Sequence, residues 1–382
     1  MTIEAFRVET DPHAIDDLRR RLAGARYSDA VTEDWSYGTS PTILLEVIER
    51  WRAHDWAARV AELNALPHFR AVVDGIGIHF LHFRGRGRAP RALLLANGWP
   101  SSFIEYSSIA RELADPAASG GDPDDAFDVV IPAMPGYGFS DRPTRPNAPR
   151  AYELYHRLMS EGLGYERYAI AGSDIGFGVA TRMALRHPDA VASIHISGSG
   201  PPPHVAPELL TDDERAFLDR VARWQREEGA YAAIQSTRPQ TLAFALADSP
   251  VGMASWLLEK YYAWTDRRER DVLAIYGNAL LDTLTLYWLT GTIGSSMRLY
   301  YESRRWPHAL GTADFVRVPT SALVLPGDIA QPPRSWLERF YNIERYVVAE
   351  RGGHFPALEV PEFYVNELRS AFRGFVAAPS RD

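Results

Sequence analysis

The sequence predicts an α/β fold, in which a mostly parallel central sheet carries helices on both faces. From residue 91 onwards, short apolar segments alternate with helical segments, which is typical of parallel strands that are buried on both faces. A helical block rich in tryptophan and tyrosine interrupts these strands, and segments with helical periodicity precede them. We therefore divide the chain into a helical arm with a first hairpin (1–90), the first part of the core (91–200), a helical lid (201–318) and the second part of the core (319–382).

The amino-terminal arm is predicted from helix-start and turn signals. Asp11 is a good N-cap, Pro12 suits the first helical position, and the apolar side chains that follow share one face up to Gly24. A second helix is predicted to begin at Ser40-Pro41, and Asp74-Gly75 between apolar segments predicts a hairpin. Because these helices are amphipathic, we expect the arm to pack on the core or on the lid.

The core strands are predicted from short apolar runs. These runs lie at 92–96, 127–132, 167–172, 191–197, 322–325 and 346–349. Helices are predicted in the gaps, for example at 177–186 and 361–372. Strands that are separated in this way by helices form a parallel sheet that is covered on both faces.

Composition excludes several classes of function. The 382 residues carry 41 basic and 49 acidic side chains, a net charge of −8, so nucleic acid and anionic membranes are not expected as partners. Cysteine is absent, which excludes disulfides, thiolate nucleophiles, iron–sulfur clusters and cysteine–zinc sites. Lys260 is the only lysine, and its neighbours fit neither a phosphate-binding P-loop nor a Schiff-base site. Since neither a signal peptide nor an apolar run of about 20 residues is visible, we expect a cytoplasmic protein, and we expect no cofactor and no metal.

The most specific local signal is the segment Gly172-Ser173-Asp174-Ile175-Gly176, which lies between an apolar strand and a helix. A sharp strand-to-helix turn that exposes one side chain needs small residues two positions before and after it. Gly172 and Gly176 meet this need around Asp174, whereas a turn centred on Ser173 would place Ile175 at one of these positions. We therefore predict Asp174 as a nucleophile. A carboxylate nucleophile forms an ester with an sp³ carbon, and that ester must then be hydrolysed.

Hydrolysis of such an ester needs a base, an acid that orients the base, and an oxyanion hole. His354 lies in a glycine-rich loop after a predicted strand, and Asp328 follows the preceding strand. The order Asp174, Asp328, His354 matches that of nucleophile, acid and histidine in α/β-hydrolases. The predicted oxyanion donors are the backbone N–H groups of Trp99, just after the first core strand, and of Ile175.

With these motifs, the chain resembles an epoxide hydrolase of the microsomal and juvenile-hormone type over nearly its whole length, including the helical amino-terminal region. The resemblance rests on Asn97–Pro100, Met134–Ser140, Gly172–Gly176, Leu325–Asp328 and Gly352–Phe355 in the core, and on Gly229–Tyr231, Gln235–Pro239, Asp248–Gly252 and Arg298–Glu302 in the lid. It implies an α/β-hydrolase fold with a helical lid insertion, and we expect a soluble bacterial member. Two positions depart from the family pattern, because Asn97 stands where histidine is usual and Ile175 stands where many members have tryptophan.

The resemblance also implies two ring-opening tyrosines in the lid, Tyr231 and Tyr300, with Tyr301 as a close competitor of Tyr300. The chemistry suits them, because opening an epoxide develops an alkoxide and a phenol with a pKa of ~10 is a suitable proton donor to it. The resemblance further predicts a cis peptide bond between Trp99 and Pro100.

The activity implied by the resemblance is the opening of an epoxide to a vicinal diol through an ester with Asp174, which water activated by His354 then hydrolyses. The expected partners are a small-molecule epoxide and water, and a homodimer is left open. The expected role is detoxification or a step in natural-product biosynthesis, such as that of enediynes. Two alternatives come from other classes. One is a haloalkane dehalogenase, which usually needs a tryptophan where this chain has Ile175, and the other is a non-catalytic receptor on the same fold.

Overall fold

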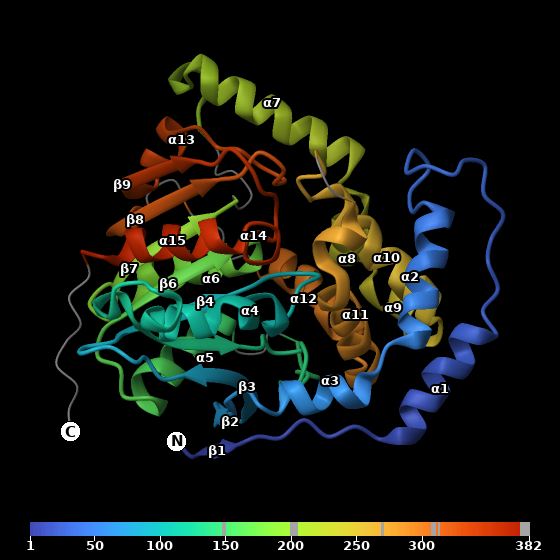
Figure 1. Cartoon of the computed structure of the whole chain (residues 1–382). Coiled ribbons are helices and arrows are strands. Elements are labelled where there is room, and N and C mark those ends of the chain that lie inside the picture. Colours follow the sequence, from blue (N-terminus) through green and yellow to red (C-terminus); the bar gives the residue numbers. More distant parts are fainter. Residues whose placement is uncertain (147–149, 199–204, 269–270, 307–310, 312–313, 375–382) are drawn as a thin grey trace.

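A nine-stranded sheet forms the centre of the protein within the residues that the computed structural model describes, which are 1–146, 150–198, 205–268, 271–306, 311 and 314–374 (Figure 1). Its strand order is β1-β2-β3-β5-β4-β6-β7-β8-β9. Strands β1, β2, β3 and β5 pair antiparallel, and every pairing from β5 through β4 to β9 is parallel. The strands are β1 (Ile3–Ala5), β2 (His68–Val73), β3 (Ile76–Phe83), β4 (Arg91–Ala96), β5 (Phe127–Pro132), β6 (Tyr168–Ser173), β7 (Val191–Ser197), β8 (Val316–Val324) and β9 (Tyr341–Val348). The predicted α/β class with a mostly parallel sheet is confirmed.

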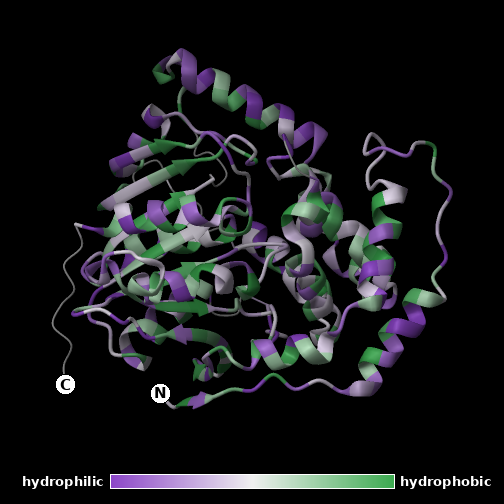
Figure 2. Cartoon of the chain, viewed as in Figure 1, coloured by the Kyte–Doolittle hydropathy of each residue, from purple (hydrophilic) through white to green (hydrophobic). Residues whose placement is uncertain are grey.

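Helices cover both faces of the sheet. The helices are α1 (Pro12–Ala23), α2 (Pro41–Ala53), α3 (Trp56–Leu63), α4 (Phe103–Ala114), α5 (Ala151–Arg157), α6 (Ile175–Arg186), α7 (Asp212–Glu227), α8 (Ala230–Thr237), α9 (Pro239–Asp248), α10 (Pro250–Ala263), α11 (Val272–Thr290), α12 (Ile293–Arg305), α13 (Arg334–Glu338), α14 (Pro356–Glu359) and α15 (Pro361–Phe372). Apolar side chains of α4 and α15 belong to the core cluster on one face, and those of α5, α6 and α13 belong to the cluster on the other. Figure 2 shows the strands between these layers coloured mainly as hydrophobic.

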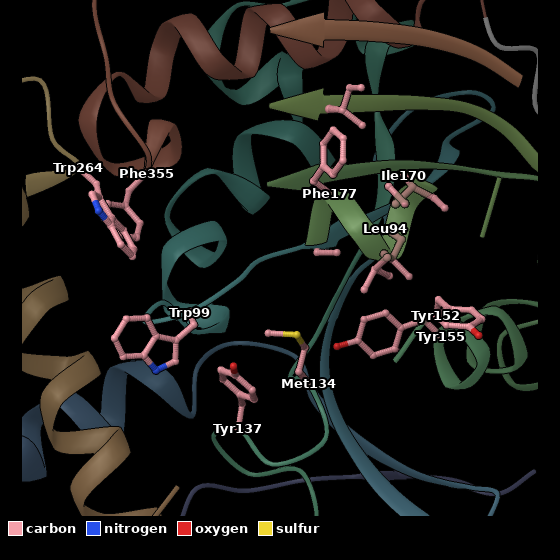
Figure 3. Close-up of a cluster of buried hydrophobic side chains, with 14 of the residues drawn as sticks. Leu94, Trp99, Met134, Tyr137, Tyr152, Tyr155, Ile170, Phe177, Trp264 and Phe355 are labelled. Carbon is pink, nitrogen blue, oxygen red and sulfur yellow. The ribbon is translucent and has the colours of Figure 1, made fainter. Parts of the chain in front are cut away.

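Strand β4 shows how alternate side chains build the two core layers. Leu93 and Leu95 pack with the cluster that contains α4 and α15, whereas Leu94 packs with the cluster that contains α5 and α6. Successive side chains of a strand point to opposite faces, so a strand buried on both faces reads as a continuous apolar run. Figure 3 shows Leu94 and Ile170 on neighbouring strands, with Phe177 of α6 in the same cluster.

Two strands are longer than predicted. Strand β8 begins at Val316 instead of residue 322, and β9 begins at Tyr341 instead of residue 346. The added part of β8 contains exposed Arg317 and polar Thr320, and β9 lies at the edge of the sheet, so neither addition has the continuous apolar run of a central strand. Residues 316–318, which the sequence analysis assigned to the lid, therefore belong to the sheet. Strand β1 and helix α3 were not predicted, and the predicted first residue of the lid, Pro201, lies outside the described residues.

The helical block lies between β7 and β8 in the chain and comprises α7 to α12. Figure 1 shows α8 to α12 grouped on one side of the sheet. The block contacts loops at the carboxyl ends of the parallel strands, because the Tyr287 hydroxyl donates to the Ser101 carbonyl oxygen at 3.3 Å and the Ser295 hydroxyl donates to the Gly136 carbonyl oxygen at 2.6 Å. Among the described residues, α11 is by length and composition apolar enough to cross a membrane, and 61% of its apolar window is buried inside the protein.

The amino-terminal arm packs on the lid, as expected from its amphipathic helices. Helices α1 and α2 contact α10, and α2 and α3 contact α11. The indole N–H of Trp51 donates to the Thr285 hydroxyl at 2.8 Å. The buried Asp282 carboxylate accepts from Arg59 Nε at 2.6 Å and lies 3.0 Å from His54 Nε2. These contacts fix residues near the start of the chain to helix α11.

Replacing Asp282 by alanine is expected to lower the free energy of unfolding by about 3 kcal/mol, because it removes the buried carboxylate that pairs with Arg59 and His54. Glu62→Ala is the matched control, since the Glu62 carboxylate pairs with the same Arg59 but is largely exposed. That variant should change stability by less than about 1 kcal/mol. Urea unfolding of both variants provides the measurement, and equal losses would show that the arm is not fixed through Asp282.

Candidate active site

The turn between β6 and α6 presents Asp174 in a strained backbone conformation. Asp174 has φ 53° and ψ −121°, outside the regions that residues other than glycine usually adopt. A Cβ on Gly172 would overlap the Gly176 carbonyl oxygen, and a Cβ on Gly176 would overlap the Ala96 carbonyl oxygen. Both glycines are therefore needed for the chain to turn this sharply. Ser173, the alternative nucleophile, is buried and hydrogen-bonds the Tyr106 hydroxyl at 2.9 Å.

The loop after β4 contacts the Asp174 carboxylate through its backbone. The N–H of Trp99 donates to Asp174 Oδ1 at 2.9 Å, and the Trp99–Pro100 bond is cis, as predicted. A Cβ on Gly98 would overlap the carboxylate, so only glycine allows this close approach. Ile175, which carries the other predicted oxyanion donor, is the first residue of α6, where backbone N–H groups have no partner within the helix. Its role as a donor stays a prediction.

Replacing Gly98 by alanine is expected to lower turnover by about 100-fold, because the added methyl group must displace the Asp174 carboxylate from its position against Trp99. Gly178→Ala is the matched control, since a Cβ on Gly178 meets nothing within 4 Å. That variant should keep the activity of the unchanged protein. Steady-state rates of diol formation compare the two, and full activity of Gly98→Ala would rule out the need for this close approach.

His354 lies between the two aspartates that the sequence analysis singled out. Its Nδ1 is 2.6 Å from Asp328 Oδ1, and its Nε2 is 3.4 Å from Asp174 Oδ2. The N–H of Ile329 donates to Asp328 Oδ1 at 2.7 Å and holds that carboxylate toward the imidazole. Burial lowers the pKa of His354, but the Asp328 and Asp174 carboxylates outweigh it, so the pKa is raised well above its usual value. Asp328 follows β8 and His354 follows β9, so neighbouring parallel strands bring them together.

The lid contributes two phenols: Tyr231 of α8 is buried, and Tyr300 of α12 is partly buried. The Tyr231 ring stacks on Trp99 with centroids 5.3 Å apart, and the Tyr300 ring meets Trp99 edge-on at 6.1 Å and Tyr231 at 6.0 Å. Burial is the largest cause that raises the pKa of each phenol, and the negative charge of Asp174 raises both further. Both phenols therefore keep their protons at neutral pH, as proton donors must.

Tyr301, the competitor of Tyr300, has different surroundings. The Arg305 guanidinium lies 5.5 Å from the Tyr301 ring centroid. Tyr301 also lines a surface hollow with Arg298 and Phe244, and that hollow includes neither Asp174 nor His354. Its contacts therefore favour Tyr300 as the second ring-opening tyrosine.

The two departures from the family pattern lie beside the nucleophile. Asn97 is buried, and its Nδ2 donates to the Gly98 carbonyl oxygen at 3.2 Å, which stabilises the loop locally. Ile175 is partly buried and packs against the core. Neither side chain replaces the backbone N–H of Trp99 that contacts Asp174.

Several residues near the site were not predicted from the sequence. The Trp264 ring packs edge-on against His354 at 4.9 Å, and the Trp264 carbonyl oxygen accepts the His354 N–H at 2.8 Å. Burial raises the pKa of Glu105 to about 7, and Ser101 Oγ donates to its Oε2 at 2.5 Å. The ammonium of Lys260 lies 4.8 Å from the Tyr231 ring centroid. Lys260 could have been noticed in the sequence, because it is the only lysine among 41 basic residues. Nothing in the sequence marks Trp264 or Glu105 as residues near the site.

Comparisons with known proteins identify the family to which the chain is similar. Residues 3–106 match the model described as epoxide hydrolase N terminus, and residues 91–372 match the model of the alpha/beta hydrolase fold. The chain is 38% identical to the protein named "Putative epoxide hydrolase" of Stigmatella aurantiaca, over 97% of this chain and 85% of that protein. It is 32% identical to epoxide hydrolase 1 of Sus scrofa, over 96% of this chain and 88% of that protein. The crystal structure of juvenile hormone epoxide hydrolase from Bombyx mori superposes with a TM-score of 0.84 at 27% identity, covering 98% of this chain and 95% of that one.

Proposed function

The chain belongs to the epoxide hydrolase family, on the α/β-hydrolase fold, and on that premise we propose that it opens small-molecule epoxides to vicinal diols through an ester with Asp174. The observation that carries the proposal is the position of the Asp174 carboxylate. Its Oδ1 accepts the Trp99 N–H at 2.9 Å, and its Oδ2 lies 3.4 Å from His354 Nε2. One oxygen is thus held at a backbone donor while the other is available to attack.

Ring opening follows from the Asp174 and tyrosine positions. Asp174 Oδ2 attacks one epoxide carbon, the carbon–oxygen bond of the ring breaks, and the released oxygen takes a proton from Tyr231 or Tyr300. Two phenols in contact with the Trp99 ring can hold the epoxide oxygen from the lid side. Because both phenols are protonated at neutral pH, either can donate.

Ester hydrolysis follows from the His354 environment. Once Asp174 is esterified it carries no charge, so one of the two carboxylates that raise the pKa of His354 is lost. The imidazolium then loses its proton to solvent more readily, and the neutral imidazole accepts a proton from the water that attacks the Asp174 carbonyl carbon. The tetrahedral oxyanion forms on Oδ1, at the Trp99 N–H, with the Ile175 N–H as the second proposed donor. When this oxyanion collapses, the bond between the Asp174 carbonyl carbon and Oδ2 breaks, and the diol leaves with that oxygen and takes the proton from the imidazolium. Asp328 keeps the imidazole oriented through Nδ1.

The proposed biological role is detoxification of epoxides or a ring-opening step in natural-product biosynthesis, such as that of enediynes. The aromatic rings of Trp99, Tyr231 and Trp264 support substrates with apolar or aromatic substituents, because these rings pack together beside the nucleophile.

Styrene oxide tests the proposed activity, with 1-bromohexane as the comparison substrate. The unchanged protein is expected to form phenyl-ethanediol and to release no bromide, and Asp174→Ala is expected to form no diol above the uncatalysed rate. Diol is measured by chromatography and bromide by ion-selective electrode. Bromide release would favour the dehalogenase alternative, absence of both products would favour the receptor alternative, and an active Asp174→Ala would contradict the ester.

A further inference from the structure

The single lysine of the chain lies directly behind one of the proposed ring-opening tyrosines. Lys260 belongs to α10 and is only 4% exposed, which is rare for lysine. Its Nζ lies 4.8 Å from the Tyr231 ring centroid and 5.9 Å from that of Trp264. It forms an ion pair with Glu259, whose side chain is 24% exposed. A buried ammonium, paired with Glu259 and also close enough to Glu228 to offset part of the rise that burial causes in the pKa of that carboxyl, is therefore held over a phenol of the site.

The Tyr231 ring is held by aromatic rings as well as by this cation. Trp99 stacks nearly parallel to it, with an angle of 9° between the rings, and Trp264 meets it at 60° with centroids 5.2 Å apart. Trp264 is four residues after Lys260, at the carboxyl end of the same helix, and its carbonyl oxygen accepts the His354 N–H. The end of α10 thus contacts both the tyrosine and the histidine of the proposed mechanism.

Most of the surroundings of Tyr231 oppose negative charge on the phenol, although a hydrogen bond with Tyr300 lowers its pKa. Burial is the largest cause that raises its pKa, and the carboxylates of Asp174 and Glu259 raise it further. During ring opening, however, the phenol transfers its proton to the epoxide oxygen and becomes negatively charged. A cation over the ring face favours the charged phenol over the neutral one, and it is attracted to the ring in both states.

We propose that Lys260 is a positioning residue for ring opening, whose ammonium holds the Tyr231 ring at the site and stabilises the negative charge that develops on it. In this step the Tyr231 O–H proton moves to the epoxide oxygen as the ring carbon–oxygen bond breaks and the bond to Asp174 Oδ2 forms. The phenol regains a proton from the water that is consumed in ester hydrolysis. This role rests on the proposed function of Tyr231 as a proton donor.

Ester formation on styrene oxide measures the effect of Lys260 on the first half-reaction alone. The experiment uses the His354→Gln background, in which the ester accumulates, with rapid quenching and intact-protein mass spectrometry. Lys260→Met keeps the length of the side chain without its charge and is expected to slow ester formation about tenfold. Lys260→Arg keeps the charge and is expected to restore most of the rate. Thermal unfolding is measured for each variant, and Lys260→Gln replaces Lys260→Met if the latter does not fold.

Combining Lys260→Met with Tyr231→Phe tests whether Lys260 acts through the Tyr231 hydroxyl or only through packing. In a Tyr231→Phe background, Lys260→Met should cause no further slowing, because the hydroxyl through which it acts is absent. In the matched Tyr300→Phe background, it should still slow ester formation about tenfold. Equal slowing in both backgrounds, or no slowing in either, would overturn the role of Lys260.

The results that would contradict the proposed function differ from those that would contradict the role of Lys260. An absent adduct on His354→Gln would overturn the ester mechanism, and an unchanged rate of ester formation in Tyr231→Phe would overturn the role of that tyrosine, whatever Lys260→Met does. With His354 intact, Lys260→Met should slow ester hydrolysis much less than ester formation, because Tyr231 donates its proton to the substrate only in the first half-reaction. A slower hydrolysis step with unchanged ester formation would place the effect of Lys260 on His354 through Trp264, and would also overturn the proposal.

Discussion

Replacing both Tyr231 and Tyr300 by phenylalanine is expected to slow ring opening by at least about 1,000-fold, whereas each single replacement should cost about 10- to 100-fold. Both rings contact Trp99, which contacts the nucleophile through its N–H, and the proposed mechanism places either phenol at the oxygen of a bound epoxide. One remaining phenol still donates a proton to the developing alkoxide. The loss of both leaves the alkoxide unprotonated in a buried site, where an unpaired charge is costly. Single-turnover ester formation with styrene oxide measures all three variants.

Tyr301→Phe is the matched control, because Tyr301 is adjacent in the chain but contacts Arg305 and lines the surface hollow. It should form the ester at the rate of the unchanged protein. If Tyr301→Phe is damaging and Tyr300→Phe is not, the assignment within this pair is reversed. Thermal unfolding of each variant separates a lost proton donor from a lost fold.

The sequence predicts best the strands that are buried on both faces. Strands β5 and β7 have the predicted bounds of 127–132 and 191–197, and every residue in them is buried. At the edge of the sheet this relation fails. Strand β9 pairs on one side only, and side chains such as Glu344 reach solvent, so polarity no longer marks where pairing begins. The arm was predicted to pack on the core or the lid, and side-chain contacts such as that of Trp51 with Thr285 show that it packs on the lid.

Some residues of the candidate site could be predicted from their neighbours in the sequence, whereas others depend on contacts between distant parts of the chain. Asp174 could be chosen over Ser173 because the glycine spacing of a sharp turn is a property of five consecutive residues. Tyr231 and Tyr300 could not be chosen from the aromatic residues of the lid without the family resemblance, because α8 and α12 meet only in the folded protein. Lys260 belongs to this second kind, since its contact with Tyr231 joins two different lid helices.

Replacing His354 by glutamine is expected to stop turnover while leaving the first half-reaction intact. The imidazole lies 3.4 Å from the Asp174 carboxylate, and in the proposed mechanism it acts as base only on the water that hydrolyses the ester. The variant should therefore gain the mass of one epoxide per chain, and peptide mapping should place the added mass on the peptide that contains Asp174. His13→Gln is the matched control, because His13 is exposed on α1, and it should turn over normally without a lasting adduct.

A single turnover of the wild-type protein in oxygen-18 water shows whether the second oxygen of the diol comes from Asp174 or directly from water. If water attacks the Asp174 carbonyl carbon, the first diol formed in a single turnover carries an unlabelled carboxylate oxygen, and the label remains on Asp174. Loss of the Trp99 or Ile175 donor would cost this step about 3 kcal/mol, so hydrolysis should respond more strongly than ring opening to the loss of either donor. Direct attack by water on the epoxide would instead label the first diol and leave no adduct on His354→Gln. That result would falsify the ester mechanism, although the fold and the family of the chain would stand, because they rest on the sheet topology and on the relatives.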